Sequence, residues 1–188
     1  MTASISIRRY LDVPDHARLA DAIEAIFFEA SNTKSFASAA ARATFRERWL
    51  GRYLRNHPQF VYLAMTASNE VAGYLVGAIA GPASAARFAD DGYPASFREA
   101  SKPYPAHLHI NLAPSYRGFG IGGRLIEAFV ADARSAGASG AHVITSAASD
   151  NVRFYIRNGF VEIARTRPVE ISSNEPLVFL GREWTEEN

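Results

Sequence analysis

The 188-residue sequence contains no cysteine. This absence excludes a disulfide framework, a cysteine–zinc site and a cysteine nucleophile. The sequence also lacks any apolar run that approaches the ~20 residues of a membrane-spanning helix. Its first eleven residues alternate as a strand does and lack the apolar core of a signal peptide. We therefore expect a cytoplasmic protein that has no membrane partner.

The sequence also lacks a large net charge of either sign, because 20 basic residues are balanced by 19 acidic residues. The sequence has no block of lysine or arginine, so we expect no nucleic-acid partner. The hydrophobic fraction of 48% and the charged fraction of 21% are typical of a compact folded protein. The length predicts a single domain over residues 1–188. The oligomeric state stays open, with a homodimer as one possibility.

Apolar periodicity predicts the elements of the first half. Residues 4–11 are predicted to be a strand, and Pro14 and Asp15 are predicted to open a helix. A second helix is predicted over about 38–55, where Phe45, Trp49 and Tyr53 recur at a spacing of four. Such a stripe is more typical of core than of a ligand site. Two further strands, at 60–66 and 71–80, are predicted to form a hairpin.

Residues 83–105 form a long segment with a short predicted helix, an acidic turn and several aromatic residues. Loops of this length in compact domains are often lids or binding loops. A substrate lid is therefore one interpretation of this segment, and a solvated surface excursion is the other.

Residues 107–112 alternate strictly, so His107, His109 and Asn111 are predicted to share one face of a strand. Two histidines at this spacing could bind a metal, but the sequence offers no evident third ligand, and we expect no metal. A general base or a substrate-orienting role fits imidazole better, because imidazole titrates near neutral pH. Structural hydrogen bonding remains the alternative.

The strand leads into a glycine-rich stretch, Arg117-Gly118-Phe119-Gly120-Ile121-Gly122-Gly123-Arg124. Glycines let the backbone curl and expose its N–H groups, and the helix predicted to begin here adds unpaired N–H donors. The stretch is therefore predicted to bind phosphate, although a turn without a ligand is possible. It lacks the lysine of a P-loop and the glycine spacing of a dinucleotide fold.

The remaining residues predict a helix ended by Gly137, a strand at 142–145 and a short helix between Ser149 and Gly159. Strands at about 160–167 and 176–182 complete the chain. Together, these patterns predict a mixed α/β domain.

Two motifs carry a resemblance to a known family. Arg117-x-x-Gly120-x-Gly122, with Pro114 before it, resembles the acetyl-CoA signature of the GCN5-related N-acetyltransferases, the GNAT superfamily. Phe154-Tyr155, followed by Gly159-Phe160, resembles the second signature of that family. The resemblance is strong over about 106–166. The strand at 107–110 is also similar to the acetyltransferase-like domains related to that of O-GlcNAcase.

The resemblance implies a mostly antiparallel central sheet of six to seven strands, flanked by helices. It also implies a V-shaped splay between the strands around 107–112 and 141–146, and it makes 83–105 an inserted loop. The pyrophosphate of acetyl-CoA would bind the amides of the glycine-rich stretch. The pantetheine arm would pair with the backbone of Leu112 and Ala113, and Asn151 would contribute to coenzyme binding.

The resemblance further implies direct attack of a free amine on the thioester, with Tyr155 as the general acid. Many members use a glutamate base, but this sequence has no carboxylate between Glu99 and Glu127. We therefore expect His109, and His107 second, to act as the base, while Asn111 orients the substrate. The acceptor would be a small-molecule or peptide amine. The alternatives are a CoA-binding or sensing module without catalysis and, less favoured, a binder of another nucleotide.

Overall fold

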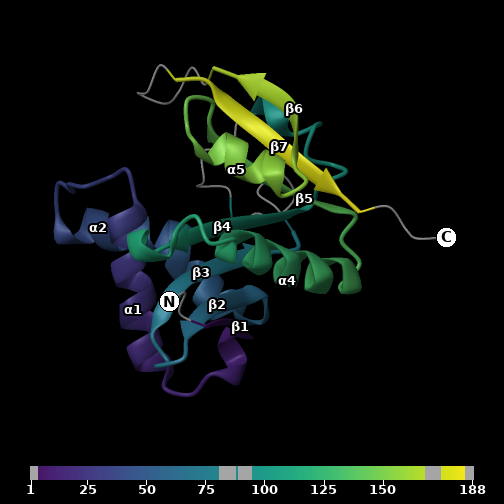
Figure 1. The fold of residues 1–188 in the computed structure, drawn as a ribbon. Helices are drawn as coiled ribbons and strands as arrows, with labels where there is room; N and C mark the ends of the chain where they lie inside the picture. Colours follow the sequence, from purple (N-terminus) through teal and green to yellow (C-terminus); the bar gives the residue numbers. More distant parts are fainter. Residues whose placement is uncertain (1–3, 81–87, 89–94, 168–174, 185–188) are drawn as a thin grey trace. The chain divides into compact units, whose positions relative to one another are not determined.

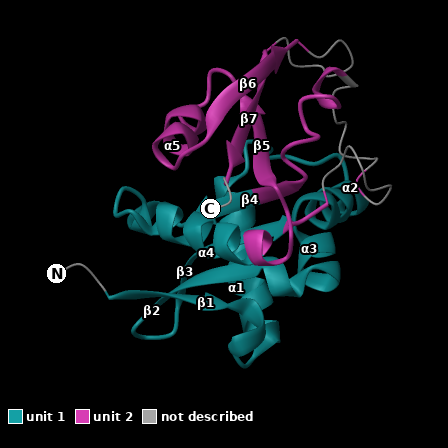
Figure 2. Cartoon of the chain, turned by 90° about the vertical axis from the view of Figure 1, so that its right-hand side faces the viewer, with its two compact units in different colours: residues 1–77, 109–132 teal, residues 78–108, 133–188 magenta. Residues whose placement is uncertain are grey.

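The computed structural model describes residues 4–80, 88, 95–167 and 175–184 (Figure 1). The chain divides into two compact units, coloured separately in Figure 2. The first unit comprises residues 1–77 and 109–132, and the second comprises residues 78–108 and 133–188. The expectation of a single domain concerns independent folding and stays a prediction.

Seven strands form the sheet, in the order β1-β2-β3-β4-β5-β7-β6 (Figure 1). Strand β4, Ala106–Leu112, has its first three residues in the second unit and its last four in the first. The pairings of β1 with β2, β2 with β3, β5 with β7 and β6 with β7 are antiparallel, whereas β4 and β5 are parallel. The predicted mixed, mostly antiparallel sheet flanked by helices is confirmed.

The first unit begins with β1, Ile5–Arg9, and α1, His16–Ala30. The side chain of Asp15 caps α1 by accepting a hydrogen bond from the N–H of Arg18, which satisfies one unpaired donor at the start of the helix. The apolar stripe of α1 is buried, because it faces the core on the 3.6-residue period of a helix. Its buried members are Leu19, Ile23, Ile26 and Phe27.

The predicted second helix is present but is interrupted by a wider turn. It consists of α2, Ala39–Arg46, a π-helical turn η2, Glu47–Gly51, and α3, Arg52–Asn56. The hairpin follows, with β2 at Val61–Thr66 and β3 at Val71–Ala78. Both strands are almost wholly buried, which places them at the centre of the first unit.

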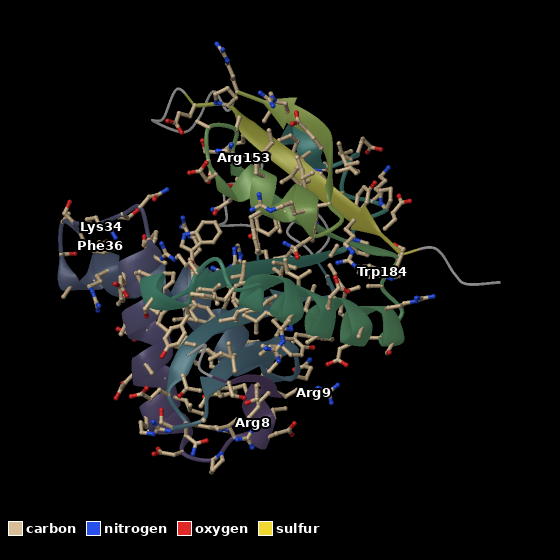
Figure 3. All side chains as sticks on the ribbon, viewed as in Figure 1. Arg8, Arg9, Lys34, Phe36, Arg153 and Trp184 are labelled. Atoms are coloured by element: carbon tan, nitrogen blue, oxygen red, sulfur yellow. The ribbon has the colours of Figure 1, made fainter. Side chains whose placement is uncertain are left out.

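Helix α4, Ile121–Ser135, follows the glycine-rich stretch. Asp132 on this helix accepts hydrogen bonds from the hydroxyl of Tyr62 at 2.6 Å and from the guanidinium of Arg9, labelled in Figure 3. Because Tyr62 lies on β2 and Arg9 on β1, the part of α4 in the first unit is tied to two neighbouring strands of that unit.

The second unit contains β5, Gly140–Ser146, α5, Asn151–Arg157, β6, Val161–Thr166, and β7, Leu177–Glu183. Its pairing of β4 with β5 joins Ala106 to Ala141 and His107 to His142. The predicted splay between these strands stays a prediction.

Much of the predicted inserted loop, 83–105, lies outside the described residues. Its later part contains a short turn of helix, η5, Ala95–Phe97. Phe97 and Tyr104 pack against Phe179 of β7, and Phe97 is fully buried. Phe97 and Tyr104 therefore anchor this part of the segment in the core of the second unit, whereas several side chains between them are exposed, and both interpretations of the segment stay predictions.

Candidate active site

The glycine-rich stretch forms a turn that leads directly into α4. Gly118 and Gly120 have φ angles of +83° and +74°, which residues with a Cβ adopt only at a cost. A Cβ built on either glycine would meet nothing within 4 Å, so the backbone conformation and not crowding requires glycine here. The turn therefore leaves open space beside its backbone.

The start of α4 adds hydrogen-bond donors to this turn. The Arg124 N–H donates to the Gly120 carbonyl at 3.3 Å and makes the first hydrogen bond of the helix. The preceding amides, those of Ile121, Gly122 and Gly123, lie in the first turn, where a helix has no internal acceptors for its N–H groups. With the positive end of the helix dipole, these donors suit a diphosphate.

The two arginines of the stretch also contact the backbone of the first unit. The Nε of Arg117 donates to the carbonyl of Leu112 at 3.0 Å, and a terminal nitrogen of Arg124 donates to the carbonyl of Ile5 at 3.0 Å. Each guanidinium carries five N–H donors, so one such bond leaves donors for an anion. Arg117 therefore links the turn to the end of β4, and Arg124 links α4 to β1.

Leu112 and Ala113 differ in whether their backbone N–H groups already have a partner on the neighbouring strand. The Ala113 N–H donates to the Ala72 carbonyl of the neighbouring strand at 3.0 Å. Successive N–H groups of an extended chain point to opposite edges, so the Leu112 N–H points away from β3. The Leu112 amide is thus the donor of this pair that remains suited to a ligand.

A glycine that the sequence analysis did not single out shapes the same strand end. A Cβ on Gly73 would lie 2.2 Å from Leu112 Cδ2 and 2.8 Å from the Asn111 carbonyl oxygen. Gly73 therefore permits the close approach of β3 to β4. In the sequence, a glycine inside the apolar, β-rich run 71–80 was the signal that could have indicated this close approach.

His109 contacts two aromatic side chains of the preceding helical segment. Its Nε2 lies 3.1 Å from the hydroxyl of Tyr53, and the centroid of its ring lies 5.3 Å from those of Trp49 and Tyr53. Tyr53 is fully buried, whereas Trp49 and His109 are half-buried. The helical stripe that was expected to be core is therefore only partly buried. Two of its residues, Trp49 and Tyr53, also contact the candidate base, His109.

Asn111 has a similar tyrosine partner on β3. Its side-chain amide donates to the hydroxyl of Tyr74 at 2.8 Å. Tyr74 is fully buried, and its burial raises the pKa of its phenol. The first unit thus holds His109, Asn111, Leu112 and the glycine-rich turn.

His107 belongs to the second unit and has a different environment. Its side chain is 4% exposed, and its ring lies 4.7 Å from that of Phe88 and 5.8 Å from that of His142. His142 is also buried, and its Nδ1 lies 2.6 Å from the Tyr104 carbonyl oxygen. Burial lowers the pKa of His142 to about 4. His107 therefore lies among core side chains, which suits a base less well than the half-buried position of His109.

Tyr155 and Asn151 lie on α5, also in the second unit. Tyr155 is 7% exposed, and its ring packs against those of Phe154 and Phe160 at centroid distances of 5.1 and 5.5 Å. Burial raises the pKa of its phenol, because the charged form loses water. Asn151 is exposed, and its backbone N–H donates to Ser149 Oγ at 3.2 Å.

Across the described residues, no three or more histidine and carboxylate side chains gather as a metal ion would require. Within the same part of the chain, no helix combines the length and apolar character of a membrane span.

Comparison with known proteins supports the fold. The fold is similar to that of SsHAT, with 22% identity over 96% of this chain and 98% of that chain, and a TM-score of 0.69. It is also similar to yncA from Salmonella typhimurium, solved with acetyl-CoA, at 18% identity over 99% and 97% and a TM-score of 0.61. Ard1 from Thermoplasma volcanium matches at 17% identity over 97% and 99%, with a TM-score of 0.60.

A family model described as the acetyltransferase (GNAT) domain matches residues 58–162, which is more than half of the chain. This match includes β2, β3, β4, the glycine-rich turn, α4, β5 and α5. The chain therefore belongs to the GNAT acetyltransferase family.

Proposed function

We propose that this protein transfers an acetyl group from acetyl-CoA to the amine of a small molecule or a peptide. The observation that carries the proposal is the turn of Gly118 and Gly120, which have positive φ angles at the start of α4 in a chain of this family. The structure of yncA with acetyl-CoA supports the choice of cosubstrate. Acetyl-CoA would supply an activated acetyl thioester and a diphosphate that anchors it.

The backbone of the first unit would bind the coenzyme. The amides between Gly118 and Arg124 would hold the diphosphate, with the free donors of Arg117 and Arg124 beside them. The Leu112 amide, which points away from β3, would donate to the carbonyl oxygen of the thioester. Ala113 would contribute through its carbonyl or its side chain, because its N–H already bonds Ala72. Phe119, exposed to 61%, and Asn151 would make further coenzyme contacts.

The acceptor must lose a proton before it can attack, because an ammonium group has no lone pair. We assign this proton transfer to His109, whose ring is half-buried and held by Tyr53. Imidazole titrates close enough to neutral pH to accept the proton there. Asn111 would orient the acceptor, and His107 is the second candidate base.

The leaving thiolate must gain a proton, which we assign to Tyr155. The raised pKa of this phenol supports the role, because the group stays protonated throughout the neutral range. A general acid of this kind contributes roughly 10²–10⁴ in rate. The proton would move from the tyrosine oxygen to the sulfur, and solvent would restore it.

A second candidate function is CoA binding or sensing without catalysis. It is favoured by the absence of a carboxylate between Glu99 and Glu127, the segment that includes all of β4. The two functions differ in turnover but share the coenzyme-binding turn.

A thiol-release screen separates these functions. The protein is incubated with acetyl-CoA and a broad library of small amines and peptides, and free CoA and the acetylated product are measured. Acetyl transfer predicts product with some members of the library above an amine-free baseline. Tight CoA binding with no product from the whole library would favour the binding module. Calorimetric titration that ranks NAD or ATP above CoA would contradict both.

A further inference from the structure

We propose that a patch of half-buried aromatic rings in the first unit binds the acceptor and selects a small primary amine that carries an aromatic ring. The patch consists of Phe28, Phe36, Phe45 and Trp49, and we call it the aromatic patch. This inference rests on the proposed function, because it names the class of amine to which the acetyl group would be transferred. It extends that function by assigning the side chains that would distinguish one amine from another.

Burial changes along the helical segment that carries Phe45, Trp49 and Tyr53. Tyr53 is fully buried, whereas Trp49 and Phe45, four and eight residues earlier, are only half-buried. Residues spaced by four share one face of a helix, so this face passes from the core to the surface. A stripe that only filled the core would be buried throughout. Its outer part instead presents apolar surface that another molecule can cover.

Ring contacts extend this surface to two phenylalanines from earlier in the first unit. Phe36, labelled in Figure 3, comes from the loop between α1 and α2. Its ring centroid lies 5.3 Å from that of Phe45 and 5.9 Å from that of Phe28, near the end of α1. The guanidinium of Arg42 lies over Phe28, with its Cζ 3.6 Å from the ring centroid. The patch is therefore a set of rings in contact, bordered by a cation at Phe28.

Trp49 connects the aromatic patch to the candidate base. Its ring centroid lies 5.3 Å from that of His109, and the two ring planes meet at 82°. An amine held at His109 would therefore bring a ring on a short alkyl link close to the indole. Among the described residues, no hydrogen bond involves the indole N–H of Trp49, whereas Trp184 donates to the Ala138 carbonyl. A tryptophan that only fills a core usually has such a partner, so packing alone does not explain Trp49.

The charges beside the patch indicate which amines would fit it. Arg42 and Arg46 both form ion pairs with Glu24, so two guanidinium groups face one carboxylate. The excess positive charge would repel a second ammonium group, which disfavours a diamine. The patch offers one polar hydrogen, the Trp49 N–H, because phenylalanine side chains have none. It therefore lacks the row of main-chain partners that a bound peptide needs, and a small monoamine with a ring fits better.

Tryptophan fluorescence tests binding without turnover. The sequence has two tryptophans, so Trp184→Phe leaves Trp49 as the single reporter. This variant is titrated with phenethylamine and with ethylamine, with CoA present. We expect phenethylamine to change the Trp49 emission with a Kd at least about tenfold lower than that of ethylamine, because apolar sites distinguish even one methylene by roughly this factor. Equal Kd values, or no response to phenethylamine, would overturn the proposal. If Trp184→Phe fails to fold, calorimetry on the parent gives both Kd values.

Acetyl transfer tests the selection itself. We expect kcat/KM for phenethylamine to exceed that for ethylamine and for 1,4-diaminobutane at least about tenfold. Trp49→Ala should lower this ratio about tenfold, mainly through KM for the amine, whereas Trp49→Phe keeps a ring and should retain most of it. Leu11→Ala is the matched control, because it removes another apolar side chain of the same unit, exposed to 52%, outside the patch. A ratio that neither Trp49→Ala nor Phe36→Ala changes would overturn the proposal.

The outcomes separate this inference from the proposed function. Binding of phenethylamine at Trp49 without transfer to any amine would contradict the proposed function and support the patch. Faster transfer to a glycine–alanine tripeptide than to every aromatic amine would overturn the inference and leave acetyl transfer intact. Sedimentation tests a second copy as the occupant: a dimeric parent and a monomeric Trp49→Ala with unchanged amine selection would also overturn it. If a circular dichroism melt shows that Trp49→Ala fails to fold, Phe36→Ala, in the loop, replaces it.

Discussion

Gly73 lies directly against Leu112, because a Cβ on residue 73 would come within 2.2 Å of Leu112 Cδ2. The backbone also approaches closely there, since the same Cβ would lie 2.8 Å from the Asn111 carbonyl oxygen. The missing side chain of one strand thus sets the position of the strand that carries His109, Asn111 and the Leu112 amide. A residue outside the candidate site thereby controls the geometry of that site.

Gly73→Ala should consequently impair both stability and activity. The leucine side chain can move, but the carbonyl is backbone, so the end of β4 must shift. Overpacking of this kind costs roughly 1–3 kcal/mol in the free energy of unfolding. Urea denaturation measures this cost, and acetyl transfer by the folded fraction measures the shift of the site. Unchanged stability together with unchanged transfer would show that the two strands can separate freely.

Gly120→Ala should weaken CoA binding without crowding the site. The added Cβ meets nothing within 4 Å, but a φ of +74° disfavours alanine by roughly 1–2 kcal/mol. We expect the Kd for CoA, measured by calorimetry, to rise about tenfold. Gly137→Ala is the matched control, since φ is +86° and the surrounding space is equally open. Equal weakening by both variants would argue against a role of the turn in binding.

Tyr155→Phe should slow acetyl transfer by roughly 10²-fold while CoA binds normally. The hydroxyl is lost but the ring remains, so its packing against Phe154 and Phe160 persists. Burial raises the pKa of the phenol, so loss of activity at mildly alkaline pH should not arise from Tyr155. Turnover equal to that of the parent, with the same CoA affinity, would rule out Tyr155 as the acid.

Acid should destabilise the fold through His142. Its folded pKa of about 4 lies below the usual value of 6.5, so the unfolded chain binds a proton that the folded chain excludes. Above about pH 6.5 this difference does not affect the free energy of unfolding, because the imidazole is neutral in both states. As the pH falls towards 4, it lowers the free energy of unfolding by on the order of 3 kcal/mol. Denaturation curves at several pH values measure the slope.

His142→Asn tests the origin of that slope. The asparagine amide can still donate to the Tyr104 carbonyl, but it does not titrate. The variant should be less stable at neutral pH, because a smaller side chain fills the space beside Phe179, yet it should lose less stability on acidification. A slope equal to that of the parent would assign the acid sensitivity to other groups.

The sequence predicted most elements because their signals are local. Helix α1 begins after Asp15 as expected, and the positive φ of Gly137 and Gly159 marks the ends of the helices they were predicted to close. The family motifs around Gly120 and Tyr155 are confirmed at the level of the family. The residue roles drawn from them stay predictions. Local periodicity and turn chemistry suffice for such features because each depends on neighbouring residues alone.

Other features depended on contacts between distant residues. The stripe of Trp49 and Tyr53 indicated core, and its periodicity could not reveal that both rings meet His109, some 60 positions further along the chain. The alternation of 107–112 also could not distinguish the environments of the two histidines. His109 contacts Tyr53, whereas His107 is buried beside Phe88. Position in a strand assigns a face, whereas the elements packed on that face decide whether an imidazole is accessible or enclosed.

The amino-acid sequence by itself determined the family, the mixed α/β class and the glycine-rich turn, because short motifs and the spacing of apolar residues indicate them. Only the tertiary structure decided that Gly73 sets the end of β4, that Tyr53 meets Nε2 of His109 and that the Ala113 amide is already paired. Each of these joins residues far apart in the chain, and packing brings them together.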